Sequence, residues 1–360
     1  MARPPGRVTY DFVTRTIART LGNPGKGYFL LLGAAVTLLA IGIICLLYLL
    51  RYGLGLAGYS HPVYWAVFIT CFVFWVGIAH SGTLISAILF LFRSGWRKKL
   101  YQLTALGWRG TNEEWRHFTR GYLYLAALAT PLVLSVHSVV SWDFAMAIVP
   151  GWHATIFAPY FVAGAIYSGC AMVISLLVPI RKLFHLEELI TVHHFENLAK
   201  LCLLTGSIVG YAYLCEYFVA WFGGNAHERA AFWYRAFGPF WWATWTMIIC
   251  NAFLPQLLWF KKIRTNITAL FVMSIFVNVG MWFERFVIIV VSLAGEPFER
   301  WSNATYNPTW ADWGIMAGSF GWFFMWFLLF VKNFPAVSIT EVKEVLPPPT
   351  KGRPAEAHAR

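Results

Sequence analysis

Residues 27–50 read GYFLLLGAAVTLLAIGIICLLYLL, a continuous apolar run without one charged side chain. An α-helix rises about 1.5 Å per residue, so a helix over this run reaches across the roughly 30 Å hydrocarbon core of a bilayer. A soluble protein has few places to bury a helix that is apolar on every side. The run therefore predicts a membrane-spanning helix, and similar runs recur along the chain.

The composition of the whole chain agrees with this interpretation. Of its 360 residues, 59% are hydrophobic and 12% are charged, whereas soluble domains carry about 25% charged residues. The mean hydropathy is +0.59. The 31 Phe and 19 Trp add more apolar surface than one water-soluble core could hide. These figures exclude a soluble enzyme, and also a collagen-like, disordered or disulfide-scaffold protein.

Runs of about 20 or more mainly apolar residues predict eight spanning helices. The expected fold class is an all-α integral membrane protein, a bundle of about eight transmembrane helices. We expect residues 1–26 to form a cytoplasmic N-terminal segment, residues 27–332 the bundle, and residues 333–360 a flexible cytoplasmic tail. The predicted spans are residues 27–50, 62–92, 118–142, 153–180, 195–222, 229–260, 265–292 and 310–332.

The basic residues predict the orientation of the bundle. Of the 28 lysines and arginines, 21 fall in the two termini and in alternate loops, whereas the loops between them hold three. Cytoplasmic loops of membrane proteins are rich in Lys and Arg. Both termini are therefore expected in the cytoplasm. Because the net charge of +12 lies between apolar runs, it indicates contact with lipid and not with nucleic acid.

The cysteines do not suggest a metal centre. Each lies inside an apolar run, and no pair has the C-x-x-C spacing typical of haem c attachment, zinc and iron–sulfur sites. The His- and Glu-rich residues 185–196 match no tight metal motif and fit a solvated loop. We expect no metal, haem or iron–sulfur cluster bound by this chain. The cysteines are Cys45, Cys71, Cys170, Cys202, Cys215 and Cys250.

Ionisable side chains are costly in lipid, so each one inside a span points to a site or a proton path. On the second predicted span, Ser81 and Thr83 follow His80, and Thr83 shares a helix face with it. The alternative is a histidine that hydrogen-bonds a neighbouring helix for structural reasons. The cost of burying His80 favours a ligand site.

The third predicted span carries a second such group near its outer end. His137 and Ser141 share a face, and Asp143 follows. Imidazole exchanges a proton near neutral pH, so a histidine with a nearby carboxylate suits proton transfer to or from a redox ligand. Asp143 could instead simply cap the helix or meet water.

The fifth and seventh predicted spans carry acids at a similar depth. Glu216 lies one turn from Tyr213, and Glu284 is followed directly by Arg285. These spans and the third run outward, which places their polar residues in the outer leaflet, with His80 deeper. A structural salt bridge between helices is the alternative for Glu284 and Arg285.

Three functions fit these residues. A quinone-reactive membrane subunit needs an amphipathic pocket and proton-accepting groups. A membrane cytochrome b needs paired axial histidines on different helices, but only His80 and His137 lie well inside spans. A secondary transporter usually has inverted repeats and broken helices; prolines interrupt several spans, yet no matched halves are visible.

A family resemblance sharpens the choice. AHSGTLISAIL at residues 79–89, LSVHSVVSWDF at 134–144, PGWH at 150–153 and MWFERF at 281–286 resemble the NrfD/polysulfide-reductase membrane family. Within it, the chain is most similar to the ActC subunits of alternative complex III, a bacterial quinol-oxidising respiratory complex. The related ActF and polysulfide-reductase subunits share the fold.

The resemblance implies a multi-pass subunit of the bacterial cytoplasmic (inner) membrane, without enzymatic activity alone. It would bind quinol, expected to be menaquinol, near the outer face and pass electrons to an extracytoplasmic iron–sulfur subunit and then to c-type cytochromes. A homologous membrane subunit would be a further partner, and proton translocation could be coupled. Expected catalytic residues are His80, His137 and Asp143; expected quinone-binding residues are His80, Ser81, Thr83, Glu284 and Arg285; and an expected proton path contains Tyr213, Glu216 and Ser141.

The chain departs from this family in one respect. ActC-type subunits usually have ten spans, whereas eight are predicted here, and the sequence passes almost directly from Trp96 to Trp108. Two further helices lie at about this place in the relatives. Either the chain is a natural short version or it lacks a helical hairpin, and a polysulfide-reductase type with eight spans is consistent with both.

Overall fold

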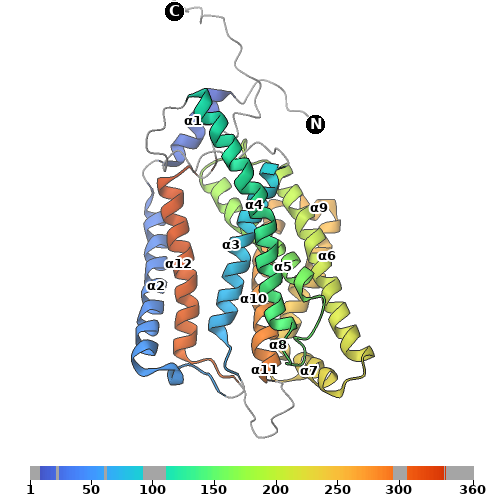
Figure 1. Ribbon diagram of the computed structural model, residues 1–360. Helices are drawn as coiled ribbons and strands as arrows, with labels where there is room; N and C mark the ends of the chain where they lie inside the picture. Colours follow the sequence, from blue (N-terminus) through green and yellow to red (C-terminus); the bar gives the residue numbers. More distant parts are fainter. Residues whose placement is uncertain are drawn as a thin grey trace, which may run out of the picture.

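The structure, a computed structural model, describes residues 9–21, 24–60, 63–91, 111–294, 306–335 and 337, without the side chains of 81–91 and 112. This part of the chain is almost entirely helical (Figure 1). The helices are α1 (Tyr10–Ala18), η1 (Arg19–Leu21), α2 (Lys26–Tyr52), η2 (Leu54–Leu56), α3 (Val67–Leu91), α4 (Asn112–Ala145), α5 (Phe157–Leu183), α6 (Val192–Phe222), α7 (Ala226–Phe237), α8 (Trp241–Ile248), η4 (Ile249–Phe253), η5 (Leu254–Trp259), α9 (Lys261–Arg264), α10 (Ile267–Phe286), η6 (Val287–Val291), α11 (Ser292–Ala294) and α12 (Trp310–Asn333).

Six helices in the described ranges are long and apolar enough to cross a membrane, so the protein is a multi-pass membrane protein. They are α2, α4, α5, α6, α12 and the continuous helix Ile267–Ala294. Helix α3 adds a shorter apolar stretch, Val67–His80. The all-α membrane fold is therefore confirmed, whereas the predicted number of eight spans is not. The proposed missing hairpin near residue 100 lies outside the described residues.

The predicted single span 229–260 is wrong. Helix α7 ends at Phe237, where the N–H of Gly238 bonds the carbonyl of Tyr234 at 2.7 Å. Pro239 follows, and a proline cannot donate the next helical hydrogen bond. A second helical stretch then runs through α8, η4 and η5 to Trp259. Pro239 is one of the prolines that interrupt the predicted spans, but the apolar composition on both sides of Gly238–Pro239 favoured one continuous span.

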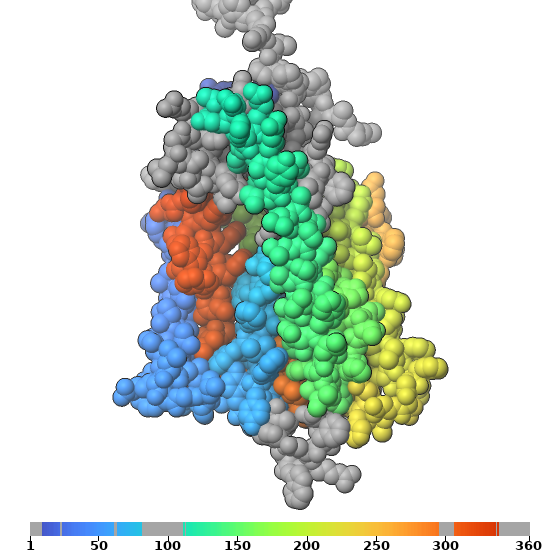
Figure 2. Space-filling model, in the orientation of Figure 1, coloured from blue at the N-terminus to red at the C-terminus, as the bar shows by residue number. Residues whose placement is uncertain are grey.

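Helices α2 and α12 pack against each other along one edge of the bundle (Figures 1 and 2). Their contact consists of small residues: a Cβ added to Gly42 would lie 2.5 Å from the Cα of Gly318. A Cβ added to Gly314 would collide with the Sγ of Cys45 on α2. Small residues let membrane helices approach closely and pack without a hydrophobic driving force.

The α2–α12 pair joins the other helices mainly through α3. The indole of Trp75 donates to the Ser319 hydroxyl at 3.0 Å and stacks on Phe323, with ring centroids 4.8 Å apart. Helix α5 and the continuous helix Ile267–Ala294, which contains α10, are central: 61% and 67% of their most apolar stretches are buried, against 17% for α2. Other helices therefore surround the polar groups on α5 and α10 and keep them out of contact with lipid.

The two ends of the bundle differ. Helix α1, the last turn of α12 and α9 lie at one end, which we call the α9 end (Figure 1). Helices α7 and α11 lie at the other, the α7 end. The first and last described helices thus start and finish at the same end, as an even number of crossings requires.

Candidate functional site

A buried ion pair lies on α10, in the half of the bundle towards the α7 end. The guanidinium of Arg285 contacts the carboxylate of Glu284, and both side chains are buried. Charges buried away from water persist when they are paired and hydrogen-bonded. This pair joins neighbouring residues of α10, so it is not the salt bridge between helices that is the alternative for Glu284 and Arg285.

Two further helices bond the Glu284 carboxylate. The Tyr213 hydroxyl on α6 donates to Oε2, and the Asn251 amide on η4 lies 3.3 Å from the same oxygen and 3.1 Å from the Tyr213 hydroxyl oxygen. The ring of Tyr160 on α5 packs edge-on against Tyr213 at 5.8 Å. Side chains of α6 and η4 thus bond the acid on α10, and α5 packs against one of them.

A glycine makes room for the ion pair. A Cβ added to Gly164 on α5 would lie 3.2 Å from the Met281 methyl and 3.4 Å from Arg285 Nη2. A second close approach occurs at Gly280, whose Cβ would collide with Asn251 Oδ1 and Cys250. The absence of side chains at these two positions brings α5 and η4 against α10 at the height of Glu284.

The two histidines predicted from separate spans lie side by side. The rings of His80 on α3 and His137 on α4 are 5.1 Å apart at 75°. His137 Nδ1 lies 3.1 Å from the Val133 carbonyl, which can only accept, so Nδ1 carries a hydrogen. Its Nε2 is buried without a partner, as is Nδ1 of His80. A neutral His137 therefore presents a free acceptor.

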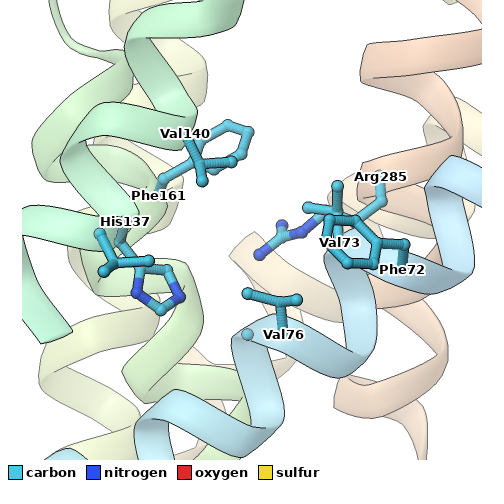
Figure 3. Close-up of a pocket in the computed structure, with 9 residues that line it drawn as sticks. Phe72, Val73, Val76, His137, Val140, Phe161 and Arg285 are labelled. Carbon is cyan, nitrogen blue, oxygen red and sulfur yellow. The ribbon is translucent and has the colours of Figure 1, made fainter.

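His137 and Arg285 face each other across a small cavity between α3, α4, α5 and α10 (Figure 3). About 10 Å³ is open to a water molecule, space for roughly one. The remaining lining is apolar, and Phe72 at the cavity is 61% exposed. The cavity thus combines two buried polar groups with an apolar side that faces away from the bundle.

Other predicted residues lie apart from this cavity. Asp143 is exposed, six positions after His137 and so about 240° round the helix. Ser141 is buried, but its hydroxyl bonds the carbonyl of Ser138 on its own helix at 2.7 Å. The side chains of Ser81 and Thr83 lie outside the described residues. The predicted pairing of His137 with Asp143 is therefore not a direct contact.

Glu216 belongs to a second polar group towards the α7 end. It is buried, its Oε1 has no hydrogen-bond partner, and it interacts electrostatically with Arg235 on α7. The Arg235 guanidinium bonds the Gly151 carbonyl at 2.8 Å and the Ser292 hydroxyl at 2.7 Å. Glu228 accepts from the Gly151 N–H at 3.1 Å. Helix α7 thereby holds the turn between α4 and α5.

Three residues of these polar groups, Asn251, Tyr160 and Arg235, have no role predicted from the sequence. Arg235 was visible as a basic residue within a predicted span. Asn251 was the sole strongly polar residue in a long apolar part of the same span, a signal that could have marked it. Tyr160 resembles the interfacial aromatic residues that are common near span ends, so no sequence pattern distinguishes it.

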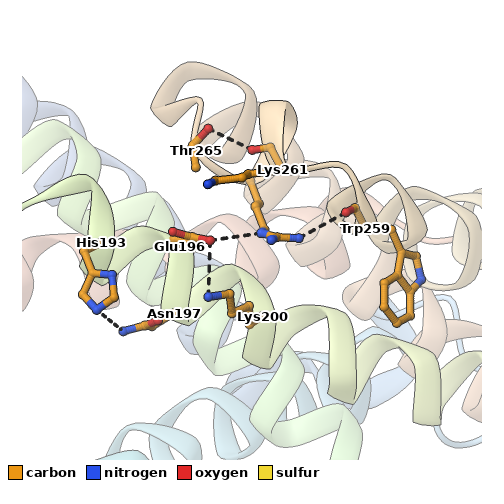
Figure 4. Close-up of polar contacts among 8 residues, drawn as sticks. His193, Glu196, Asn197, Lys200, Trp259, Lys261 and Thr265 are labelled. Atoms are coloured by element: carbon orange, nitrogen blue, oxygen red, sulfur yellow. Dashed lines mark hydrogen bonds and ion pairs between the residues drawn. The ribbon is translucent and has the colours of Figure 1, made fainter. Parts of the chain in front are cut away.

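At the α9 end, ion pairs and hydrogen bonds connect α6 to α9 (Figure 4). Glu196 lies 3.2 Å from Arg264 and 3.3 Å from Lys200, and Arg264 also donates to the Trp259 carbonyl at 3.1 Å. His193 bonds Asn197 on its own helix at 3.2 Å. Within the described ranges, no three His, Cys, Asp or Glu residues form a group that could hold a metal ion.

A comparison with known protein families gives a match over the second, third and later helices of the site. A family model described as "Polysulphide reductase, NrfD" matches residues 95–294, over half of the chain. The matched region contains His137, Glu284 and Arg285, whereas His80 lies before it. No curated protein matches the chain.

Proposed function

Because the chain belongs to the NrfD polysulphide reductase family, we propose that it is the quinol-binding membrane subunit of a respiratory complex of the alternative complex III type. The family consists of membrane subunits of quinone-interacting oxidoreductase complexes, which associate with iron–sulfur subunits. In this proposal the protein oxidises menaquinol near the outer face of the bacterial inner membrane. Electrons pass to an extracytoplasmic iron–sulfur subunit and on to c-type cytochromes.

The observation that carries the proposal is the cavity between His137 and Arg285. A quinol is an apolar molecule with two polar oxygens, and it reaches its site from the bilayer. The cavity matches this chemistry, since Phe72, Val76 and Val140 form an apolar approach and His137 and Arg285 supply a base and a donor. A head group would enter by displacing the partly exposed apolar side chains at the approach.

In the proposed chemistry, residues of this chain accept the protons and the iron–sulfur subunit accepts the electrons. Oxidation of a quinol removes two electrons and two protons. His137 Nε2 accepts a proton from one hydroxyl, while Arg285 donates a hydrogen bond to a ring oxygen as it becomes a carbonyl. The electrons leave for the iron–sulfur partner. The quinone product keeps both oxygens and has only acceptors, so it no longer offers His137 a proton.

The other predicted residues take supporting roles. His80 lies beside His137. Together with Ser81 and Thr83, it orients the second hydroxyl of the quinol or accepts the proton of that hydroxyl. Asp143, exposed near the α7 end, receives protons only after they leave the cavity. The buried groups Tyr213, Glu216 and Ser141 belong to the proposed proton path. If proton translocation is coupled, the Tyr213–Glu284 contact is its start.

A second candidate is the membrane subunit of a polysulfide or quinone reductase, because the matching family is described by that activity. In that case the cavity binds quinone or quinol in the same way, but electrons flow in the opposite direction or pass to a different soluble partner. The identity of the co-purifying subunits distinguishes the two. An iron–sulfur subunit with c-type cytochromes indicates alternative complex III, whereas a soluble subunit that reduces polysulfide, without c-type cytochromes, indicates the reductase.

The test uses the complex purified gently from its native membrane. We expect His137→Gln to lower the rate of menaquinol oxidation by about 100-fold, the range of general-base catalysis, while the complex stays assembled. We expect His80→Gln to act in the same direction. His193→Gln is the matched control, because His193 is an exposed histidine at the α9 end.

Three results would overturn the proposal. The first is unchanged menaquinol oxidation in the assembled complex carrying both His80→Gln and His137→Gln. The second is a chain that purifies without redox subunits. The third is a chain that shows its own b-type haem in a reduced-minus-oxidised spectrum.

A further inference from the structure

Asn251 lies in a wide helical turn that the regular pattern of the chain would not produce. Residues Ile249–Phe253 form one π-helical turn between α8 and η5. Pro255 follows four residues after Asn251 and lacks the N–H that would bond the Asn251 carbonyl in a regular α-helix. A π-turn adds a residue to the turn and so changes which side chain faces the neighbouring helix.

The π-turn directs Asn251 towards α10. The side chain is fully buried, and its amide nitrogen lies 3.1 Å from the Tyr213 hydroxyl oxygen and 3.3 Å from Glu284 Oε2. Gly280 lies one helical turn before Glu284, and a side chain there would collide with the Asn251 amide oxygen. Two separate features, the π-turn and Gly280, therefore place the amide against the carboxylate.

The contacts of Glu284 show what the amide does. One carboxylate oxygen contacts Arg285, and the other is shared by Tyr213 and Asn251. Hydrogen bonds to a charged acceptor are short and strong, so the two donors Tyr213 and Asn251, together with the ion pair to Arg285, fix the carboxylate in one orientation. Glu284 in turn holds the guanidinium of Arg285, which projects into the cavity opposite His137 (Figure 3).

We propose that Asn251 is a positioning residue of the quinone site, which acts through Glu284 to aim Arg285 at the ring oxygen of the bound head group. The inference rests on the proposed function, because it takes the ligand of the cavity to be a quinone. Asn251 itself does not line the cavity. Its loss therefore affects the affinity for the head group through Arg285, and not through a direct contact.

Two variants separate the donor from the bulk of the side chain. Asn251→Asp keeps the size but replaces the donor by an acceptor and places a second carboxylate beside Glu284. Asn251→Ser is smaller but keeps a hydroxyl donor. The matched control is Asn278→Asp, because Asn278 is a polar residue of α10 that bonds the Ser175 hydroxyl and the Ser274 carbonyl and not Glu284.

The experiment measures binding of 2-heptyl-4-hydroxyquinoline N-oxide, a quinol analogue, to the assembled complex, together with the steady-state kinetics of menaquinol oxidation. For Asn251→Asp we expect analogue affinity to fall, and menaquinol KM to rise, by about tenfold or more, the effect of losing a hydrogen bond to a charged group. We expect Asn251→Ser to recover part of this loss, and Asn278→Asp to stay within about twofold.

The infrared difference spectrum supplies a readout that general destabilisation would not change. The carboxylate band that disappears in Glu284→Gln should shift in Asn251→Asp and stay in place in Asn278→Asp. Wild-type affinity and KM in assembled Asn251→Asp would overturn the inference. Failure of both Asn251 variants to assemble would overturn it too, by assigning the residue a role in folding. If the wild-type complex neither binds the analogue nor oxidises menaquinol, it is the proposed function that fails.

Discussion

Arg285 reaches the cavity because the residue facing it on α5 is Gly164. Replacement of Gly164 by Leu should overpack this contact, lower the free energy of unfolding by about 1–3 kcal/mol and displace the Arg285 guanidinium. Gly164→Ala should have a smaller effect, since its nearest neighbour, the Met281 methyl at 3.2 Å, is the end of a flexible side chain. Thermal unfolding of the purified complex measures both effects.

Gly121→Leu serves as the control, because an added Cβ at this position on α4 meets nothing within 4 Å. An unfolding temperature and a menaquinol oxidation rate in Gly164→Leu equal to those of Gly121→Leu would show that the helices tolerate a larger side chain beside Arg285.

Single residues of the candidate site could be predicted from the sequence where burial in lipid is costly. His80, His137, Glu284 and Arg285 stood out for this reason, and the structure places them around one region. Their adjacency could not be predicted, because helical spacing orders residues along one helix and not between helices. Asn251 was missed because it is uncharged and its orientation depends on a π-turn that has no simple sequence period.

At the scale of elements, long apolar runs predicted α2, α5 and α12 to within a few residues, because a run of that length and composition has one stable form in a bilayer. The same criterion joined α7 to α8 wrongly. Hydropathy averages over a window, so it does not register the loss of one N–H at Pro239 or the break that follows.

The packing of α2 on α12 leads to a prediction of its own. Gly42→Leu should force the two helices apart and lower the unfolding temperature, since even a Cβ at Gly42 would lie 2.5 Å from the Gly318 Cα. Gly33→Leu, on the same helix, should leave it unchanged because nothing lies within 4 Å of an added Cβ. Equal unfolding temperatures for the two variants would contradict the tight contact.

For the whole molecule, the distribution of basic residues predicts which end faces the cytoplasm. Lys261, Lys262 and Arg264 lie at the α9 end, so this end should be cytoplasmic and the α7 end should face outward. Green fluorescent protein fused to either terminus should fluoresce. Alkaline phosphatase inserted after Ile148, which is 94% exposed in the turn between α4 and α5, should be active. The reverse pattern of activities would show the opposite orientation and would place the proposed site in the inner leaflet.

The pairing of α2 with α12 also constrains how the protein is made. Synthesis proceeds from the N-terminus, so α2, which ends at Tyr52, enters the membrane long before α12 begins at Trp310. During that interval the glycine face of α2 has no partner, because α2 packs chiefly on α12. Helix α12, the last described helix to leave the ribosome, therefore completes the contacts of α2. A chain that stops short of residue 310 therefore carries α2 with its glycine face uncovered, a surface that distinguishes an unfinished copy from a finished one.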